Sequence, residues 1–281
     1  MTPPPAGPRG PEITSTRAAR VKAAARLAKR AFRDRDRRFL AEGPQAVREA
    51  VGRPGTVREL FATREAAQRY ADVVAAAAAG GADVALASGE VLATLSQTVT
   101  PQGLVAVCEV VDVPLDELLS TAPRLVAVLA HVRDPGNAGT VVRAADAAGA
   151  GGVVLTGDSV DPYNGKCVRA SAGSLFHLPV VVGHDVTREL PGLRAAGLRV
   201  VAADGHGDTD LDDAVDAGLL EGPTAWVFGN EAWGLPDATR ALADAVVRVP
   251  IHGRAESLNL ATAAAVCLYA SARAQRRQPS G

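Results

Sequence analysis

The sequence has few cysteines and no cysteine pair. Its three cysteines, Cys108, Cys167 and Cys267, lie far apart and form no CxxC motif. An odd number of widely spaced cysteines argues against a disulfide scaffold and a zinc site, and it is typical of a reducing compartment. The histidines show no metal-ligand spacing, and the GHGDTD segment at 205–210 is typical of a turn. We therefore expect a cytoplasmic protein without a bound metal.

Long hydrophobic runs are also missing. A membrane helix needs about 18 strongly apolar residues in succession, and no such stretch occurs. The opening residues, MTPPPAGPRGPE, lack the apolar core of a signal peptide. Hydrophobic residues make up 47% of the chain and charged residues 22%, which is ordinary for globular proteins. We expect no membrane partner, and enough apolar surface to bury a core.

Lysine is scarce, with three lysines among 30 basic residues, a bias that we attribute to coding preference rather than to function. The net charge is −1, but residues 1–53 hold 13 basic and 5 acidic residues, a net of +8, which leaves −9 for the remainder. A basic segment of this kind indicates RNA or DNA as a partner. The alternative is a solvated, arginine-rich helix without a binding role.

The pattern of apolar residues predicts two α/β domains. Residues 1–15 are rich in proline and glycine and are expected to be a disordered tail, and residues 16–34 read as one helix with a narrow apolar stripe. A mixed α/β pattern follows, so the first domain is placed at 16–115, with a boundary near residue 120. The second domain, 121–281, alternates six apolar strands with helices and ends in a long helix at 256–277, which predicts a mostly parallel sheet.

Three loops that follow predicted strands carry the candidate chemistry, because ligands of open α/β sheets bind beyond the carboxyl ends of the strands. The first, 131–150, runs into a helix that places Arg143 among small and apolar residues, with Asn137 near its start. The second, 226–235, delivers Gly229 and Glu231. A glycine there permits a close approach to the backbone. The alternative for the first loop is a helix start with a surface arginine, and the alternative for the second is an ordinary strand-to-helix turn.

The third loop, 249–269, ends at the start of the long helix. Ser257 is a natural N-cap, which is its structural interpretation. Asn259 is then expected inside the first turn, where this residue type is unfavourable without a partner. We expect both side chains to face the crevice of the first two loops.

Two other classes of enzyme are disfavoured by missing motifs. The GxGxxG fingerprint of a dinucleotide-binding oxidoreductase is absent, and no serine lies in a GxSxG elbow of a hydrolase.

At the three loops the sequence resembles the SpoU/TrmH branch of the SPOUT RNA methyltransferases. The stretches that carry the resemblance are RDPGNAGTVVRAADAAGA, FGNEAWGL and VPIHGRAESLNLATAAA, in the family's order, and RASAGSLFHLPV at 169–180 is also similar. The resemblance covers residues 121–281. The N-terminal half, with RFLAEGPQAVREAV and SQTVTPQGLVAV, is similar to the L30e-like substrate-binding domain of the family.

The resemblance implies a C-terminal domain with a deep trefoil knot that binds S-adenosylmethionine. It also implies a homodimer with the active site at the interface, for which an exposed apolar face of the last helix (Leu260, Ala264, Cys267, Leu268) would be suited. Burial of that face within one subunit is the alternative. The positions implied for cofactor binding are Ala203, Gly229, Asn230, Val249, Ile251 and Leu258.

The implied reaction is methyl transfer to a ribose 2′-hydroxyl of RNA, with 23S ribosomal RNA favoured and transfer RNA left open. Arg143 would deprotonate or polarise the hydroxyl, and a role on the adjacent phosphate is the easier one for a protonated guanidinium. Asn137, Glu231, Ser257 and Asn259 would hold Arg143 and the ribose. A non-catalytic RNA-binding or ribosome-assembly protein of the same fold is the alternative. Housekeeping modification and antibiotic self-resistance both stay open.

Overall fold

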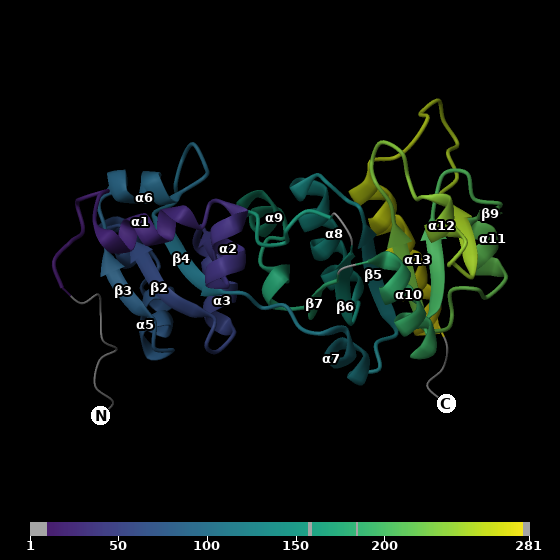
Figure 1. Cartoon of the computed structure of the whole chain (residues 1–281), viewed down its shortest axis with the longest axis horizontal. Coiled ribbons are helices and arrows are strands. Elements are labelled where there is room, and N and C mark those ends of the chain that lie inside the picture. Colours follow the sequence, from purple (N-terminus) through teal and green to yellow (C-terminus); the bar gives the residue numbers. More distant parts are fainter. Residues whose placement is uncertain (1–9, 157–158, 184, 278–281) are drawn as a thin grey trace. The chain divides into compact units, whose positions relative to one another are not determined.

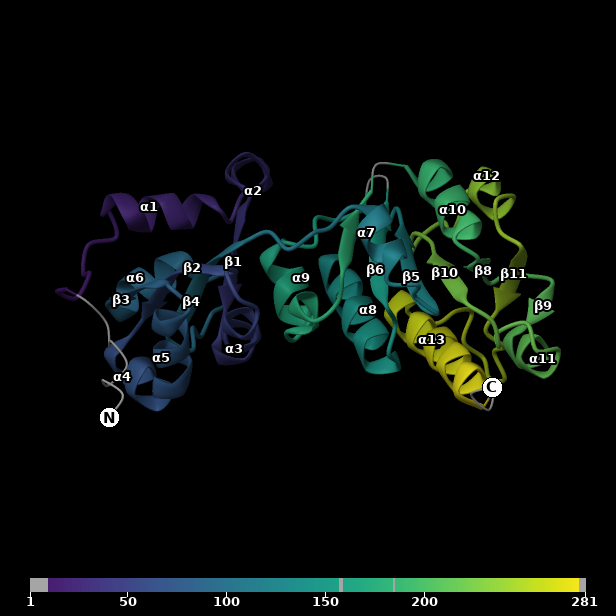
Figure 2. The ribbon, with the colours of Figure 1, turned by 90° about the horizontal axis from the view of Figure 1, so that it is seen from below.

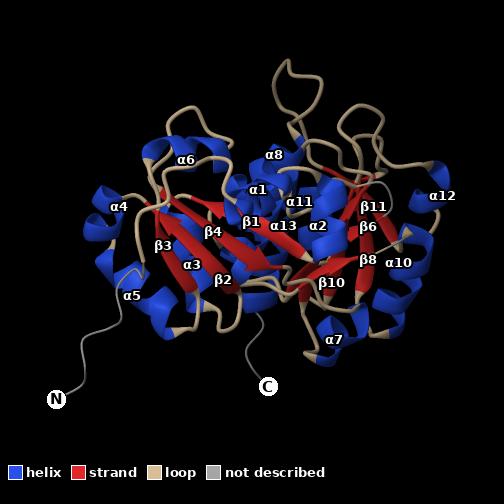
Figure 3. Cartoon of the chain, turned by 60° about the vertical axis from the view of Figure 1, so that its left-hand side comes forward, coloured by secondary structure: helices blue, strands red, loops and turns tan. Residues whose placement is uncertain are grey.

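The computed structural model describes residues 10–156, 159–183 and 185–277. The chain divides into two compact units (Figure 1). Unit 1 holds Met1–Val111 and Tyr163–Phe176, and unit 2 holds Asp112–Pro162 and His177–Gly281. In each unit, helices cover a β-sheet, as the secondary-structure colours of Figure 3 show.

Unit 1 is built on a four-stranded sheet with the order β1–β4–β2–β3. β4 runs antiparallel to both of its neighbours, and β2 and β3 are parallel. The strands are β1 (Arg38–Glu42), β2 (Val57–Ala62), β3 (Asp83–Leu86) and β4 (Leu104–Glu109). The helices are α1 (Ala19–Arg26), α2 (Arg30–Asp36), α3 (Pro44–Gly52), α4 (Arg64–Arg69), α5 (Ala71–Ala79), α6 (Gly89–Leu95), α9 (Gly165–Ala170) and the 3₁₀ turn η1 (Ser174–Phe176).

The basic N-terminal segment forms two helices where the sequence predicted one. α1 ends at Arg26, and just beyond its end the guanidinium of Arg33, on α2, donates to the carbonyls of Leu27 and Ala28, each at 2.9 Å. These bonds satisfy carbonyl groups that the end of a helix leaves without partners. α1 buries Val21, together with Ala24 and Leu27, against α6. The segment is thus part of the core of unit 1 as well as a carrier of charge.

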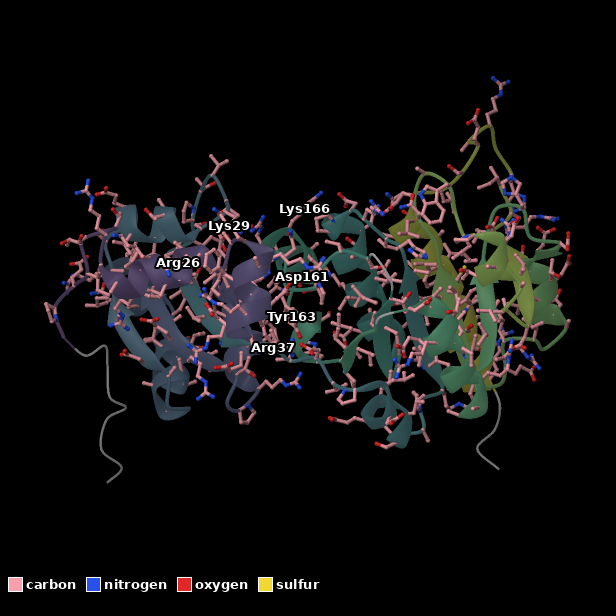
Figure 4. All side chains as sticks on the ribbon, in the orientation of Figure 1. Arg26, Lys29, Arg37, Asp161, Tyr163 and Lys166 are labelled. Atoms are coloured by element: carbon pink, nitrogen blue, oxygen red, sulfur yellow. The ribbon has the colours of Figure 1, made fainter. Side chains whose placement is uncertain are left out.

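A short segment from far along the chain completes unit 1. The ring of Phe39 on β1 lies 4.6 Å from the ring of Tyr163 (labelled in Figure 4) and 6.0 Å from that of Phe176. The Tyr163 hydroxyl accepts a hydrogen bond of 2.8 Å from the backbone N–H of Val111. A single boundary near residue 120 therefore does not describe the chain, because local sequence patterns do not show where a loop packs.

Unit 2 is built on a seven-stranded sheet with the order β7–β6–β5–β10–β8–β11–β9. Every pair of neighbouring strands is parallel, which confirms the predicted parallel sheet. The strands are β5 (Leu125–Ala130), β6 (Gly152–Thr156), β7 (Val180–Val182), β8 (Arg199–Ala203), β9 (Thr209–Asp210), β10 (Thr224–Phe228) and β11 (Ala245–Arg248). β9 has only two residues and no apolar run, so the sequence did not predict it. The trefoil knot stays a prediction.

Helices cover both faces of this sheet, with α8 and α13 on one side and α10 and α12 on the other (Figure 2). They are α7 (Leu115–Ser120), α8 (Pro135–Ala148), α10 (Val186–Ala195), α11 (Leu211–Asp216), α12 (Asp237–Arg240) and α13 (Leu260–Arg277). None of the helices in the described part of the chain has the length and hydropathy needed to cross a membrane.

Three of the four residues of the predicted apolar stripe of α13 are buried within the chain, and the fourth, Leu260, is half-buried. Ala264, Cys267 and Leu268 are each 0% exposed, and α13 packs on α8, β5 and β10. These side chains are therefore not available to a second copy, so the prediction of an exposed interface stripe was wrong. Burial within one subunit, the alternative, is what the structure has.

Candidate active site

Four strands of unit 2 end side by side and place the predicted site residues along one edge of the sheet. In register, Leu129 of β5 pairs with Phe228 of β10, Phe228 pairs with Ala203 of β8, and Ala203 pairs with Val247 of β11. The loops that follow these strands carry most of the predicted residues, because parallel strands present their carboxyl ends at the same edge. Ala203 is the last residue of β8, and Arg143 lies within α8.

The first loop turns from β5 into α8 through a local cap. The carboxylate of Asp134 accepts a 2.8 Å hydrogen bond from the backbone N–H of Asn137, and Pro135 occupies the first turn. Proline suits this position because its missing N–H would have had no helical partner there. The cap fixes Asn137 at the mouth of the helix, where its side chain is half-buried.

The second loop is a tight hairpin after β10. Asn230 and Gly234 exchange two backbone hydrogen bonds of 2.8 and 2.9 Å, and Gly234 has a φ of +71°. A Cβ on Gly229 would lie 2.5 Å from the carbonyl group of Gly234. In this structure, the backbone of Gly234 therefore lies close to Gly229. The side chain of Asn230 ties the hairpin to β5 by donating to the carbonyl of His131 at 2.9 Å.

Glu231 gathers donors from the first loop. Its Oε1 accepts from Nδ2 of Asn137 at 3.1 Å and from the backbone N–H of Asp134 at 3.4 Å, and its Oε2 accepts from the backbone N–H of Arg133 at 3.5 Å. The bond from Asn137 has an ordinary length, and the two backbone bonds are long and weak by the usual geometry. The carboxylate is exposed.

Asn259 brings the third loop to the same point. Its Nδ2 donates to Oδ1 of Asn137 at 3.1 Å, so Glu231, Asn137 and Asn259 form one chain of hydrogen bonds. This confirms the prediction that Asn259 faces the crevice of the first two loops. We call these three residues the amide–carboxylate cluster.

Asn259, and not Ser257, caps the last helix. α13 begins at Leu260, four residues later than the start predicted at 256, and Oδ1 of Asn259 accepts from the backbone N–H of Ala261 at 2.9 Å. The asparagine therefore uses one side chain for two tasks, a cap and a link to Asn137. The prediction that Asn259 lies inside the helix was wrong, because asparagine is as good a cap as serine.

Arg143 and Ser257 are exposed and take no part in the hydrogen bonds of this cluster. Within the described residues, neither side chain has a hydrogen-bond or ion-pair partner. Arg143 lies six residues beyond Asn137 on α8 and therefore points to another side of the helix. In the single chain, Asn137, Glu231, Ser257 and Asn259 do not hold Arg143, and that role stays a prediction.

The predicted cofactor positions lie at the ends of β8, β10 and β11. Ala203 ends β8, Gly229 and Asn230 follow β10, and Val249 follows β11. Ile251 and Leu258 are 38% and 37% exposed, on a segment that extends from unit 2 as the olive-yellow loop of Figure 1. None of the described backbone groups of residues 251–258 pairs with another backbone group. Exposed apolar side chains beside unpaired backbone groups fit a ligand that has both an apolar ring system and polar atoms.

Asp204, which the sequence did not single out, fixes the loop after β8. Its side chain is 4% exposed, and it accepts hydrogen bonds from the backbone N–H of His206 at 2.9 Å and from Nη1 of Arg240 at 3.3 Å. Burial opposes its ionisation, but these bonds together outweigh burial and lower the pKa of Asp204. The only available hint was an aspartate directly after an apolar strand. The described residues contain no group of side chains suited to a metal ion.

An open hollow of about 680 Å³ lies over the first two loops. It is lined by Arg133, Asp134, Asn137, Asn230, Glu231, Ala232 and Trp233. The site therefore combines amide groups, a carboxylate, a guanidinium and an aromatic ring at one edge of the sheet. Such a set can hold a polar ligand by hydrogen bonds and a flat ligand by stacking.

Comparison with known proteins agrees with this geometry. Residues 124–269 match the SpoU rRNA Methylase family, and residues 18–106 match the MRM3-like substrate binding domain. The chain is 34% identical over 262 residues to the 23S rRNA (guanosine(2553)-2'-O)-methyltransferase RlmP of Bacillus subtilis, covering 92% of this chain and 98% of that protein.

Two further relatives cover nearly the whole chain. The 23S rRNA (uridine(2479)-2'-O)-methyltransferase of Streptomyces viridochromogenes is 33% identical over 95% of this chain and 93% of its own length. The crystal structure of an AdoMet-bound rRNA methyltransferase from Sinorhizobium meliloti has a TM-score of 0.79 and 33% identity, over 94% of this chain and 97% of that one. By sequence and by structure, the chain belongs to the SpoU rRNA methylase family.

Proposed function

We propose that the protein methylates a ribose 2′-hydroxyl of 23S ribosomal RNA with S-adenosylmethionine as the methyl donor. The observation that carries the proposal is the amide–carboxylate cluster, which joins the three family motifs at the carboxyl ends of β5 and β10. The names of the relatives from Bacillus and Streptomyces support ribosomal RNA over transfer RNA. With ribosomal RNA as substrate, we place the reaction in the cytoplasm.

The ligand would lie at the ends of β8, β10 and β11. Backbone groups of Gly229, Asn230, Val249 and Ile251, with the side chains of Leu258 and Ala203, would hold S-adenosylmethionine, which supplies an electrophilic methyl group. When bound, it would give this methyl group to the ribose 2′-oxygen, the bonding electrons would stay on sulfur as a neutral thioether, and the hydroxyl proton would pass to solvent. The task of the chain is to orient the 2′-hydroxyl and to receive or relay its proton.

The amide–carboxylate cluster suits the orienting task. The Glu231 carboxylate accepts from Asn137, which fixes the direction of that amide, and the amide oxygen then accepts from Asn259. The two amides and the carboxylate still have lone pairs and N–H groups to offer to a ribose, because each makes fewer bonds than its atoms allow. Ser257, exposed and two residues before Asn259 in sequence, would add a hydroxyl.

Arg143 would serve the site of a second copy. It lies on an exposed face of α8 with Thr140 and Ala147, away from the cluster of its own chain. On α13, Val266 and Tyr269 are 40% and 51% exposed, and the Tyr269 hydroxyl donates to the Ala147 carbonyl at 3.3 Å. The two helices thus share one surface that carries both exposed apolar groups and Arg143.

A homodimer through this α8–α13 surface would bury Val266 and Tyr269 and bring Arg143 to the partner's cluster. There the guanidinium would bind the phosphate next to the target ribose and polarise the 2′-oxygen. Light scattering of the purified protein tests the dimer. A monomer at micromolar concentration, with full activity, would contradict it.

Unit 1 would bind the RNA outside the active site. Residues 18–106 match a substrate-binding domain, and the exposed basic side chains of α1 and of the turn after it suit a phosphate backbone. Whether the modification is a housekeeping one or protects against an antibiotic depends on which nucleotide is reached, and that choice is made by the shape of the RNA.

The test uses S-adenosylmethionine with a labelled methyl group and three separate substrates: unmodified 23S RNA, unmodified transfer RNA, and large ribosomal subunits. Labelled RNA is digested to nucleosides. We expect a 2′-O-methylnucleoside from 23S RNA, free or in the particle. A base-methylated nucleoside would overturn the roles given to Arg143 and the cluster, label in transfer RNA alone would move the substrate, and no label in any of the three would favour the non-catalytic alternative.

A further inference from the structure

The two tryptophans of the chain are placed in opposite ways. Trp226 on β10 is 0% exposed, and its indole N–H donates to the hydroxyl of Ser271 at 2.8 Å. Trp233 is 52% exposed, and its indole N–H has no partner among the described residues. A large aromatic side chain left open to water, with its polar tip unused, is typical of a recognition surface rather than of a core.

The exposed ring of Trp233 is held in place by its surroundings. The hairpin that carries it is closed by the two backbone bonds between Asn230 and Gly234, and Oδ1 of Asn230 accepts from the backbone N–H of Ala232 at 2.9 Å. The Trp233 ring centroid lies 5.6 Å from that of His131, with the two planes inclined by 48°. The carbonyl of His131 is in turn bonded to Asn230. The indole therefore contacts the His131 ring at a tilt, and Trp233 is still 52% exposed.

Trp233 lines the hollow over the candidate active site, together with Asn137, Glu231 and Arg133. It lies two residues after Glu231, so a ribose held by the amide–carboxylate cluster would bring a base within reach of the indole. Unpaired RNA bases stack on aromatic side chains, and enzymes that act inside folded RNA or DNA often take a base out of its stack.

We propose that Trp233, backed by His131, is a stacking platform for an unpaired base at or next to the nucleotide that is methylated. The proposal rests on the proposed function for the class of ligand, which is single-stranded RNA. The indole face would carry the base, and the neighbouring guanidinium of Arg133 would lie near its phosphate. The platform would select nucleotides that can leave their stack, and it would not by itself read which base is present, since every base has a flat face.

The experiment uses the fluorescence of Trp233 itself. Trp226 is buried and gives a constant background, so a change in emission on adding RNA reports the exposed indole. The probes are oligoadenylate and an abasic ribose–phosphate oligomer of the same length, which has the phosphates without the bases. We expect quenching by oligoadenylate and none by the abasic oligomer, and we expect the quenching to vanish in Trp233→Phe.

Three substitutions of Trp233 distinguish base stacking from a contact that needs only an apolar side chain. Loss of a stacked base is expected to weaken oligoadenylate binding by ~10-fold in Trp233→Ala. Trp233→Leu keeps an apolar side chain without a π face and should behave like alanine, whereas Trp233→Phe should stay within ~3-fold of wild type. In the methyl-transfer assay, Trp233→Ala should raise the KM for RNA and leave the KM for S-adenosylmethionine unchanged. Equal thermal unfolding temperatures of the variants would show that the exposed position does not affect folding.

Several results would overturn the platform. These are equal binding of oligoadenylate by wild type and Trp233→Ala, equal quenching by the two oligomers, quenching by S-adenosylmethionine alone, and a shift of emission on dilution without RNA. The last two would assign Trp233 to the cofactor or to a second copy. If the wild type transfers no methyl group to any RNA but the base-dependent quenching holds, the proposed function fails and the platform stands.

Discussion

Glu42 in unit 1 and Glu231 in unit 2 each gather hydrogen bonds from a loop far away in the sequence, but they do so in different ways. The side chain of Glu42 is 9% exposed and accepts from the hydroxyls of Ser96 and Thr98, from the backbone N–H of Gln97 at 3.0 Å, and from Arg169 at 3.3 Å. Glu231 is exposed, its bonds are 3.1 to 3.5 Å long, and no cation pairs with it among the described residues.

This difference indicates that Glu42 has a structural role and that Glu231 belongs to a site that can still bind a ligand. Glu42 has a full set of donors and a guanidinium from its own chain, so nothing further is needed to satisfy it. Glu231 has one bond of ordinary length, two long bonds, and a position on the lining of the hollow. It is therefore free to change partners when RNA arrives. We expect substitutions at Glu42 to change stability and substitutions around Glu231 to change activity.

Glu231 has no cation partner in its own chain, and the substitution with the largest expected effect tests whether Arg143 of a second copy supplies one. Arg143→Ala should lower methyl transfer on the order of 100-fold, the usual loss when a positioned charge is removed from a transition state. It should leave the unfolding temperature unchanged, because the side chain has no partner in its own chain. Thr140→Ala, on the same exposed face of α8, is the matched control and should stay near wild-type activity.

Mixing inactive variants sharpens this test. If Arg143 acts on the partner's site, refolding a mixture of Arg143→Ala and Asn259→Ala chains would form mixed dimers with one intact site. We expect activity to return in the mixture. A mixture as inactive as its components would mean that Arg143 and Asn259 act in the site of the same chain. A second copy would then not explain why Glu231, unlike Glu42, has no cation beside it.

The next effect in size concerns Glu231 itself. Glu231→Gln keeps the shape but replaces one acceptor oxygen by an amide N–H, which would face the donors of Asn137, Asp134 or Arg133. The displaced Asn137 should lower methyl transfer on the order of 10-fold, because small errors in position are costly in catalysis. The unfolding temperature should change by ~2 °C or less. A large loss of stability with normal specific activity would give Glu231 a structural role like that of Glu42.

Much of this site could be predicted from the sequence, because it follows from strand ends. The continuous apolar runs of β5, β8 and β10 predicted a parallel sheet, and such a sheet brings Asn137, Glu231 and Asn259 to one edge. What failed was local: Ser257 and Asn259, two residues apart, are both good caps, and the sequence does not show which one the helix uses. The same ambiguity placed the start of α13 too early.

Other features were out of reach because they depend on contacts between distant segments. The break between α1 and α2 is spanned by hydrogen bonds of the buried guanidinium of Arg33, and a helical pattern cannot show that an arginine will turn inward. The packing of Tyr163 and Phe176 on Phe39 joins residues more than a hundred positions apart. Arg143 was predicted beside Asn137 by motif alone, and helix geometry points the two side chains in different directions.

The cations of unit 1 allow the comparison to be extended to RNA binding. Lys22, Arg26 and Lys29 are exposed and have no ion-pair partner in the described residues, whereas Arg30 and Arg35 pair with Asp34 and Asp36 (Figure 4 labels Arg26 and Lys29). Changing the three unpaired cations to glutamine should reduce the slope of log affinity for RNA against log salt by about 2. Deletion of the whole segment would be a poorer test, because Val21 and Leu27 belong to the core.

The matched control changes Arg30 and Arg35 to glutamine, and it should reduce the slope by less than the triple change. Affinity for S-adenosylmethionine should be the same in both sets. If the two sets have equal slopes, the basic segment is a solvated surface without a binding role, and unit 1 contributes to the protein through packing alone.

The smallest effect is a change in stability at Glu42. Burial opposes the ionised form of Glu42, but the hydrogen bonds from Ser96, Thr98 and Gln97 and the charge of Arg169 together outweigh it, so the pKa of Glu42 is lowered. A carboxylate whose folded pKa lies below its unfolded value of about 4.3 contributes stability that is complete above that pH. The contribution is lost as the pH falls through the folded pKa. Glu42→Gln should therefore reduce the free energy of unfolding by about 1 kcal/mol at pH 7, measured by urea denaturation, with methyl transfer within about two-fold of wild type.

The pH dependence of the unfolding free energy shows whether Glu42 stabilises the fold through its charge or only through packing. The difference in unfolding free energy between wild type and Glu42→Gln should shrink as the pH is lowered below about 4, because protonation removes the charge of Glu42 in both states. Glu65→Gln, at an exposed position in the first turn of α4 without a hydrogen-bond partner in the described part of the chain, should lower the free energy of unfolding at pH 7 by less than Glu42→Gln does. A difference at Glu42 that stays constant from pH 7 into the acid range would mean that the amide disturbs the loop by its shape. In that case the charge of Glu42 would add nothing to the free energy of unfolding beyond its hydrogen bonds. Glu42 and Glu231 would then differ only in the number and length of their hydrogen bonds.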